Sequence, residues 1–200
     1  MNCTDNSKNL FWKDAKLNED QVYLVFRGTK SKEGFFARDF NIQDTLSSHV
    51  GLLIRDKTNW SIFHIANFKH KNVSDLKKQS FQVFFDKKKE DINYVSFWKI
   101  INIDSIEVKQ IKKELNKYLS KFIKFDKLFT RQDSTKMYCS EFVYKILHQV
   151  DSTNFNFKTH KRKLKGVYKT YFKKDTLEYF PVDVFQKNEN IKKIKEWYFK

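Results

Sequence analysis

Glycine and proline are scarce in this sequence, with four glycines and one proline in 200 residues. Linkers and domain boundaries are usually rich in these two residues, so structural elements have to be located from hydrophobic periodicity instead. Cysteine is scarce as well, since only Cys3 and Cys139 occur. Because Cys3 is near a terminus and Cys139 lies in a strongly patterned segment, no structural disulfide between them is expected.

Long hydrophobic runs are also lacking. No segment approaches the roughly 18 to 20 apolar residues of a membrane span, and the polar start, residues 1–8, does not fit a signal peptide. A complete chain of this kind would be expected in the cytoplasm. However, residues 2–7 resemble the start of a mature bacterial lipoprotein with Cys3 as the lipid acceptor. This second interpretation favours the cell envelope or periplasm.

Acidic residues are too few to balance the basic ones, and the formal net charge is +16. Such a charge predicts attraction to an anionic polymer or to a membrane surface. The 40 basic residues include only five arginines, so lysine dominates. Base-reading contacts favour arginine, so no specific nucleic-acid partner is expected. A basic nucleic-acid-binding module nevertheless remains the non-enzyme alternative, because aromatic residues are interleaved with lysines in residues 154–174.

Aromatic residues are abundant, at 17% of the chain, and 21 of them are phenylalanine. They supply enough apolar area for one globular domain, which we place at residues 20–200 after an N-terminal extension at residues 1–19. Residues 154–174 form an expected loop or insertion within that domain. Periodicity predicts strands at residues 21–27, 48–55, 60–67 and 94–101, and helices at about 105–123 and 139–150. Residues 180–185 predict a turn, and residues 191–199 fit either a strand or a helix.

Two histidines flank a predicted hairpin, His49 on its first strand and His64 on its second. Opposed residues of an antiparallel pair have a constant index sum. A sum of 113 would place the two histidines directly opposite each other, and a sum of 115 would make them diagonal neighbours. Either register leaves both side chains on one face and within reach of each other. Two adjacent imidazoles suit a catalytic base whose tautomer is fixed by a partner, although ordinary half-buried histidines would follow the same pattern.

Cys139 lies at the predicted start of a helix whose other apolar positions include Val143 and Ile146. Backbone amides and the macrodipole at a helix start stabilise a thiolate, so a nucleophile with a lowered pKa is one expectation. A buried core cysteine is the other, because the helical spacing fits both. A zinc site recruiting His49, His64, His70 and Cys139 is disfavoured, since the sequence has no ligand pair at a recognised metal spacing.

The histidine hairpin, Ser-His-Val-Gly-Leu-Leu-Ile followed by Phe-His-Ile-Ala, resembles that of NlpC-type cell-wall cysteine peptidases. Tyr-Cys-Ser-Glu-Phe-Val-Tyr around Cys139 similarly resembles their nucleophile helix. Because the histidines precede the cysteine, the order is that of the circularly permuted branch, the YiiX/YaeF-like amidases. The similarity spans about residues 20–190 and includes shorter matches at residues 25–27, 125–126 and 181–183.

The resemblance implies an α+β, papain-like fold in which a mainly antiparallel sheet packs against helices and the nucleophile starts a helix. It further implies Cys139 as nucleophile, His49 as general base and His64 as the residue orienting that base, with no metal or cofactor. Three features depart from the family. The permuted branch often has a carboxylate where His64 stands, residues 19–21 replace its usual Gly-Asp, and residues 154–174 have no counterpart.

The activity implied is hydrolysis of an amide bond through an acyl-enzyme on Cys139, with a bacterial peptidoglycan peptide as the expected substrate. A lipid amidase, thioesterase or acyltransferase is the alternative, since the permuted arrangement also resembles the lecithin:retinol acyltransferase group. The sequence leaves the oligomeric state open.

Overall fold

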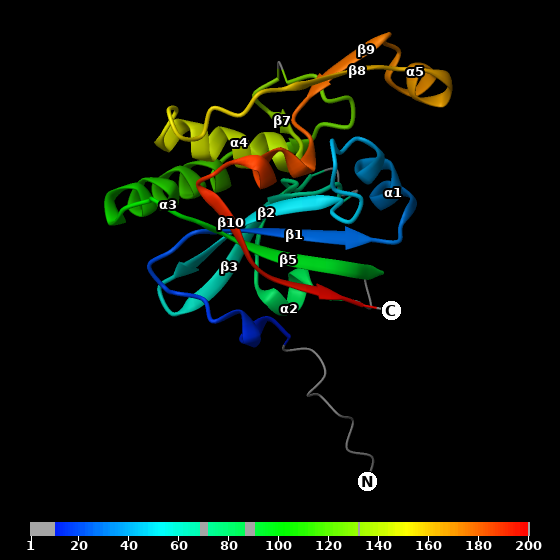
Figure 1. Cartoon of the computed structure of the whole chain (residues 1–200). Helices are drawn as coiled ribbons and strands as arrows, with labels where there is room; N and C mark the ends of the chain where they lie inside the picture. Colours follow the sequence, from blue (N-terminus) through cyan, green and yellow to red (C-terminus); the bar gives the residue numbers. More distant parts are fainter. Residues whose placement is uncertain (1–10, 69–71, 87–90, 132, 200) are drawn as a thin grey trace.

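The computed structural model describes residues 11–68, 72–86, 91–131 and 133–199. Its centre is a six-stranded sheet in the order β10-β5-β1-β2-β3-β4, and every neighbouring pair is antiparallel (Figure 1). Cys3 and His70 lie outside the described residues. The strands of this sheet are β1 (Tyr23–Thr29), β2 (His49–Asp56), β3 (Asn59–Ile65), β4 (Leu76–Gln79), β5 (Ile92–Ile100) and β10 (Ile191–Tyr198).

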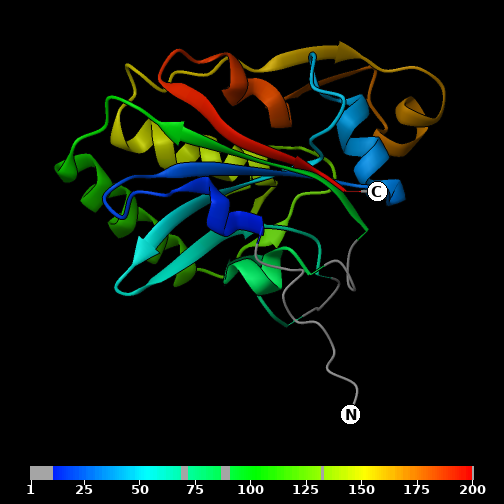
Figure 2. The ribbon, with the colours of Figure 1, turned by 60° about the horizontal axis from the view of Figure 1, so that its bottom comes forward.

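Helices cover both faces of the sheet, which explains why β1 is buried along its whole length. Helices α3 (Ser105–Leu119) and α4 (Cys139–Val150) share one apolar core with alternate strand residues such as Val50 and Leu52. The intervening strand residues, such as Leu53, pack into a second core with α2 (Phe81–Phe84) and the 3-10 helix η2 (Phe11–Ala15). Figure 2 shows the sheet between these two layers. The period-two alternation of the strands therefore assigns each side chain to one of the two cores.

The expected α+β architecture with a large antiparallel sheet is confirmed. The predicted strands occur within a few residues of their expected bounds, and the C-terminal segment that fitted either type is strand β10. Helix α3 begins with a capping box, in which the side chains of Asp104 and Glu107 each accept from the other residue's backbone N–H. No helix of the described residues is long and apolar enough to cross a membrane.

The prediction of a loop at residues 154–174 is wrong in part. This stretch contains β8 (His160–Lys163), which pairs with β9 (Thr176–Tyr179), and helix α5 (Gly166–Phe172). Helix α1 (Lys32–Asp39) was also not predicted, and the turn expected at residues 180–185 is largely the 3-10 helix η3 (Val182–Lys187). The two short helices were hard to foresee because each has a single buried residue, Gly34 in α1 and Phe172 in α5, and so shows no periodic apolar pattern. Strands β6 (Lys124–Phe125) and β7 (Lys136–Met137) form a separate parallel pair.

Buried carboxylates organise the loops around α4. Asp183 is 2% exposed and accepts hydrogen bonds from the backbone N–H groups of residues 42–44 at 2.8 to 3.0 Å. Asp126 is 3% exposed and accepts from the backbone of residues 128–131. Each carboxylate satisfies several backbone donors that the irregular chain would otherwise leave without partners.

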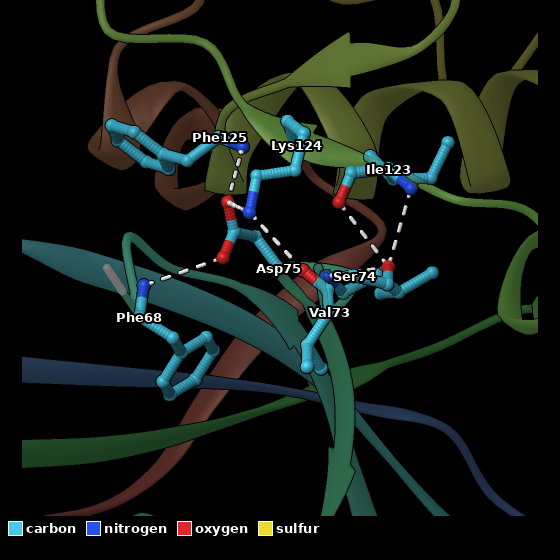
Figure 3. Close-up of polar contacts among 8 residues, drawn as sticks. Phe68, Val73, Ser74, Asp75, Ile123, Lys124 and Phe125 are labelled. Carbon is cyan, nitrogen blue, oxygen red and sulfur yellow. Dashed lines mark hydrogen bonds and ion pairs between the residues drawn. The ribbon is translucent and has the colours of Figure 1, made fainter. Parts of the chain in front are cut away.

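A third buried carboxylate, Asp75, joins the loop before β4 to the segment leading into β6 (Figure 3). Its oxygens accept from the backbone N–H of Phe125 at 2.9 Å and of Phe68 at 3.4 Å, and pair with Lys124 Nζ at 3.0 Å. The adjacent Ser74 hydroxyl also bonds the backbone of the second segment. The carboxylate thus connects two segments about 50 residues apart in the chain.

Replacing Asp75 with alanine should lower the free energy of unfolding by about 2 to 4 kcal/mol, because buried donors lose their acceptor. Urea denaturation would measure the loss. Asp56, which pairs with Lys78 on the surface, provides the control, and Asp56→Ala should cost less than about 1 kcal/mol. Equal losses for the two variants would show that the Asp75 contacts do not hold the loops together.

Candidate functional site

The β2–β3 hairpin adopts the second of the two expected registers, in which paired residues have an index sum of 115, as in Leu52 with Phe63. His49 and His64 are therefore diagonal neighbours on one face, as this register predicted. The paired ladder runs from the turn as far as Leu52 and Phe63, whereas β2 extends to His49 and β3 to Ile65. The histidines occupy these outer ends of the two strands.

Gly51 faces His64 in this register and leaves room for it. A Cβ atom built on Gly51 would lie 3.1 Å from His64 Cβ and 3.0 Å from Ile62 Cγ2. It would also lie 3.1 Å from the backbone oxygen of Phe63, which cannot move aside as a side chain can. The missing side chain therefore allows His64 to lie across β2 toward His49.

The two imidazoles are directly hydrogen-bonded, with His49 Nε2 2.9 Å from His64 Nδ1. The other nitrogen of His64, Nε2, is 2.8 Å from the amide oxygen of Gln79 on β4. An amide oxygen only accepts, so His64 must carry its proton on Nε2 and offer Nδ1 as an acceptor. His49 must then donate from Nε2, which leaves its Nδ1 unprotonated. One glutamine thus fixes the tautomers of both histidines.

Cys139 is brought to the same site from the other side of the sheet. It is the first residue of α4, and the backbone N–H of Val50, the residue after His49, acts to lower the pKa of its thiol. The backbone N–H groups of Cys139 and Ser140 act on this pKa in the same direction. The N-cap residue, Tyr138, makes no side-chain cap, so its side chain does not occupy the first backbone donors of the helix.

Burial dominates the electrostatics of the histidines. Burial and the positive charge of Arg27 lower the pKa of His64 from 6.5 to about 3. Burial, Arg27 and His64 likewise hold the pKa of His49 well below 6.5. Arg27 pairs with His49 in the β1–β2 register, and its guanidinium lies 4.3 Å from the ring centre of Phe84, which also packs against His64. Both imidazoles are therefore neutral at pH 7.

The expectation of a cysteine with a lowered pKa is wrong. Cys139 is 7% exposed, and burial raises the pKa of its thiol above 9.0, although the three backbone N–H groups oppose the shift. The effect of burial on the thiol pKa is larger than that of the helix start. Removing a thiolate from water costs more free energy than a few backbone N–H donors restore. A neutral thiol beside neutral imidazoles is the resting state of this arrangement.

His49 and Cys139 line one cleft of about 1290 Å³. Its walls come from α1, α5, the loop around Phe129 and the segment after β9. The segment after β9 is fastened to the start of α4, because Ser140 Oγ donates to the Phe180 carbonyl at 2.7 Å and the Tyr138 hydroxyl accepts from the Phe180 N–H at 2.9 Å. About a third of the lining residues are aromatic: Phe35, Phe36, Phe40, Phe125, Phe129, Tyr138, Tyr168, Tyr171, Tyr179 and Phe180.

The sequence indicated Cys139, His49 and His64 as candidates but gave no sign of Gln79, of Phe84 or of the proximity of Arg27. Gln79 and Phe84 lie on elements too short to show a periodic pattern, and Arg27 was noted only as part of a motif. His70, a proposed zinc ligand, lies outside the described residues. Among the residues that the structure describes, no group of three or more His, Cys, Asp or Glu side chains could hold a metal ion.

Comparisons with known proteins support the fold and leave the chemistry open. The chain resembles the crystal structure of the metalloprotein YiiX from Escherichia coli O157:H7, a DUF1105 protein, with a TM-score of 0.64. The two share 13% sequence identity over 90% of this chain and 98% of that one. The chain has a YiiX-like fold. No protein-family model matches it, and no curated protein gives a significant match.

The tautomers can be observed directly. Long-range ¹H–¹⁵N correlation spectra of the imidazoles should show both His49 and His64 protonated on Nε2 and neutral at pH 7. Gln79→Ala should disturb this pattern, because His64 then loses the acceptor that fixes its proton, whereas Gln82→Ala on the exposed side of α2 should leave it unchanged. Protonation of His64 on Nδ1 in the wild type would contradict the relay.

The reactivity of Cys139 should follow its raised pKa. Alkylation by iodoacetamide should be slow near pH 7 and should accelerate by about tenfold per pH unit toward pH 9, because the thiolate is the reacting form. Mass spectrometry of the Cys139 peptide over this range would measure the rate, with unfolded protein as the reference for an ordinary thiol. A rate that is already fast and constant from pH 6 upward would show a preformed thiolate instead.

Proposed function

We propose that this protein is a papain-like cysteine hydrolase of the permuted NlpC type that forms an acyl-enzyme on Cys139. The observation that carries the proposal is the relay from Gln79 through His64 to His49, which leaves His49 Nδ1 as a free base. The backbone N–H of Val50, next to that base in the chain, acts to lower the pKa of the Cys139 thiol. His49 also lines the same cleft as Cys139, which a purely structural histidine would not need.

In the proposed reaction, Cys139 Sγ attacks a carbonyl carbon while His49 Nδ1 takes the thiol proton. The concerted transfer suits a thiol with a raised pKa and a base with a lowered one, since neither group is charged beforehand. Backbone N–H groups at the start of α4 are the natural donors to the oxyanion. His49 then returns the proton to the leaving group, and a water activated by His49 releases the acyl group.

The substrate carbonyl belongs to an amide or an ester. A peptidoglycan peptide remains one candidate. The aromatic wall of the cleft favours the other candidate, a lipid amide or acyl ester, because apolar side chains gain little from a polar peptide but bind an acyl chain. We therefore place acyl substrates first, which reverses the order that the sequence suggested.

A metal-dependent reaction fits the residues poorly. YiiX is described as a metalloprotein. Here, His49 Nε2 and His64 Nδ1 are hydrogen-bonded to each other, and His64 Nε2 is bonded to Gln79, so three of the four imidazole nitrogens already have partners. No third ligand completes a cluster among the described residues. The proposed mechanism therefore uses the side chains alone.

The activities of single variants should distinguish the roles of Cys139, His49 and His64. Cys139→Ala and His49→Ala should each lower kcat by about a million-fold, and His64→Ala by some tens of thousands, by analogy with other triads. His64→Gln should recover part of that loss because its amide can still accept from His49. A panel of acyl esters, acyl amides and muropeptides would be the substrates, with circular dichroism to verify folding of each variant.

The same panel can disprove the mechanism. If His49→Ala retains full activity on a substrate that Cys139→Ala cannot process, the base is another group and the relay is structural. If the wild type and Cys139→Ala process every substrate equally, Cys139 is not the nucleophile.

A further inference from the structure

Helices α1 and α5 lie next to each other at one end of the molecule, as both ribbon views show (Figures 1 and 2). Their contact is aromatic: the ring of Phe36 lies 5.2 Å from that of Tyr168 and 5.8 Å from that of Phe172, and Phe40 contacts the same two rings. In both helices these inward positions are four residues apart, so each helix buries one stripe against the other.

The neighbouring positions on the two helices are apolar as well and are at least half exposed, although Tyr171 also contacts Phe36, at 5.7 Å between ring centres. Phe35 on α1 is 62% exposed, and Val167 and Tyr171 on α5 are 74% and 50% exposed. All three line the cleft that contains Cys139. Single exposed apolar residues are common on protein surfaces, but three that share the mouth of one apolar cleft form a patch. We call Phe35, Val167 and Tyr171 the interfacial rim.

The segment that carries Val167 and Tyr171 of the interfacial rim is strongly basic. Residues 158–174 contain eight lysines and arginines and no aspartate or glutamate. The described ion pairs of this segment involve Lys161, Arg162 and Lys169. The other five are lysines, and those flanking α5, such as Lys165 and Lys173, are exposed. Lys30 and Lys32 add further exposed charge next to α1.

Exposed apolar side chains surrounded by lysines suit the interface of an anionic lipid bilayer. The lysines would contact the lipid headgroups while the apolar side chains enter the acyl boundary. An acidic polymer or a nucleic acid would use the lysines but would leave Phe35 and Val167 in water. An acidic polymer therefore does not account for the rim.

We propose that the interfacial rim docks the protein on an anionic membrane surface, so that the acyl chain of a membrane lipid enters the cleft that α1 and α5 line together with Cys139. The delivery of a substrate to Cys139 rests on the proposed function, whereas the docking itself does not. The proposal also gives a role to residues 158–174, which have no counterpart in the family that the sequence resembles.

Binding of the full chain to vesicles tests the docking. Co-sedimentation would compare vesicles of phosphatidylcholine alone with vesicles that also contain phosphatidylglycerol. The wild type should bind the anionic vesicles, and added salt should weaken this binding. Phe35→Ser should lower the affinity by about fivefold or more, because an aromatic side chain no longer enters the bilayer. Ile106→Ser on α3 is the matched control, since Ile106 is also 62% exposed, and it should bind as the wild type does.

Two double variants test whether the lysines beside the interfacial rim contribute to vesicle binding. Lys165→Glu with Lys173→Glu should lower the affinity for anionic vesicles by about tenfold or more. Lys109→Glu with Lys113→Glu, the same change on the exposed side of α3, should lower it much less. Equal effects of the two double variants would show a non-specific attraction of the whole surface and would overturn the proposal. Equal binding of Phe35→Ser and the wild type would also overturn it, because the rim would then not enter the membrane.

Cys139→Ala separates this proposal from the proposed function. It should bind anionic vesicles as tightly as the wild type. Vesicle binding by the wild type and Cys139→Ala without any Cys139-dependent activity would leave the docking standing and reject the hydrolase. Cys139-dependent hydrolysis of a soluble short-chain ester without vesicle binding would reject the docking and leave the hydrolase standing.

Discussion

The hydrogen bond between the imidazoles of His49 and His64 is the constraint on which the rest of the site depends. The amide oxygen of Gln79 requires the proton of His64 to be on Nε2. Two neutral rings can then share the bond in only one way, with His49 Nε2 as the donor. Several features of the fold serve this bond. The register of the hairpin makes the rings diagonal neighbours, Gly51 has no side chain to separate them, and α2 places Phe84 against both. Among the described residues, His49 is thus oriented by packing and by hydrogen bonds rather than by a carboxylate.

No carboxylate bonds either imidazole in the part of the chain that the structure describes, and this has an electrostatic consequence. In a triad with an acidic third member, the negative charge stabilises the imidazolium that forms during the reaction. Here Arg27 has the opposite effect and, together with burial, disfavours the protonated rings. The thiol is also held neutral by burial. In the proposed reaction, proton transfer would therefore accompany the attack of the sulfur on the substrate carbonyl.

The acidic residues that are buried have a structural use outside the relay. Asp75, Asp126 and Asp183 are 2%, 3% and 2% exposed, and each accepts backbone hydrogen bonds from a loop near the cleft. Carboxylates that organise loops internally do not offset the surface lysines. The charge excess is therefore expressed at the surface, including the mouth of the cleft, where residues 158–174 have no acidic residue.

The sequence by itself determined the central elements, because strand and helix periodicity report directly which side chains face a core. It also determined that His49 and His64 share a face, since both registers allowed this, and that Cys139 begins a helix. Only the tertiary structure decided between the two registers, placed Cys139 beside Val50, and brought Gln79 into the relay. It also reversed the expected pKa shift of Cys139. The physical reason is that local patterns encode orientation within one element, whereas burial and contacts between distant segments arise only when the elements pack together.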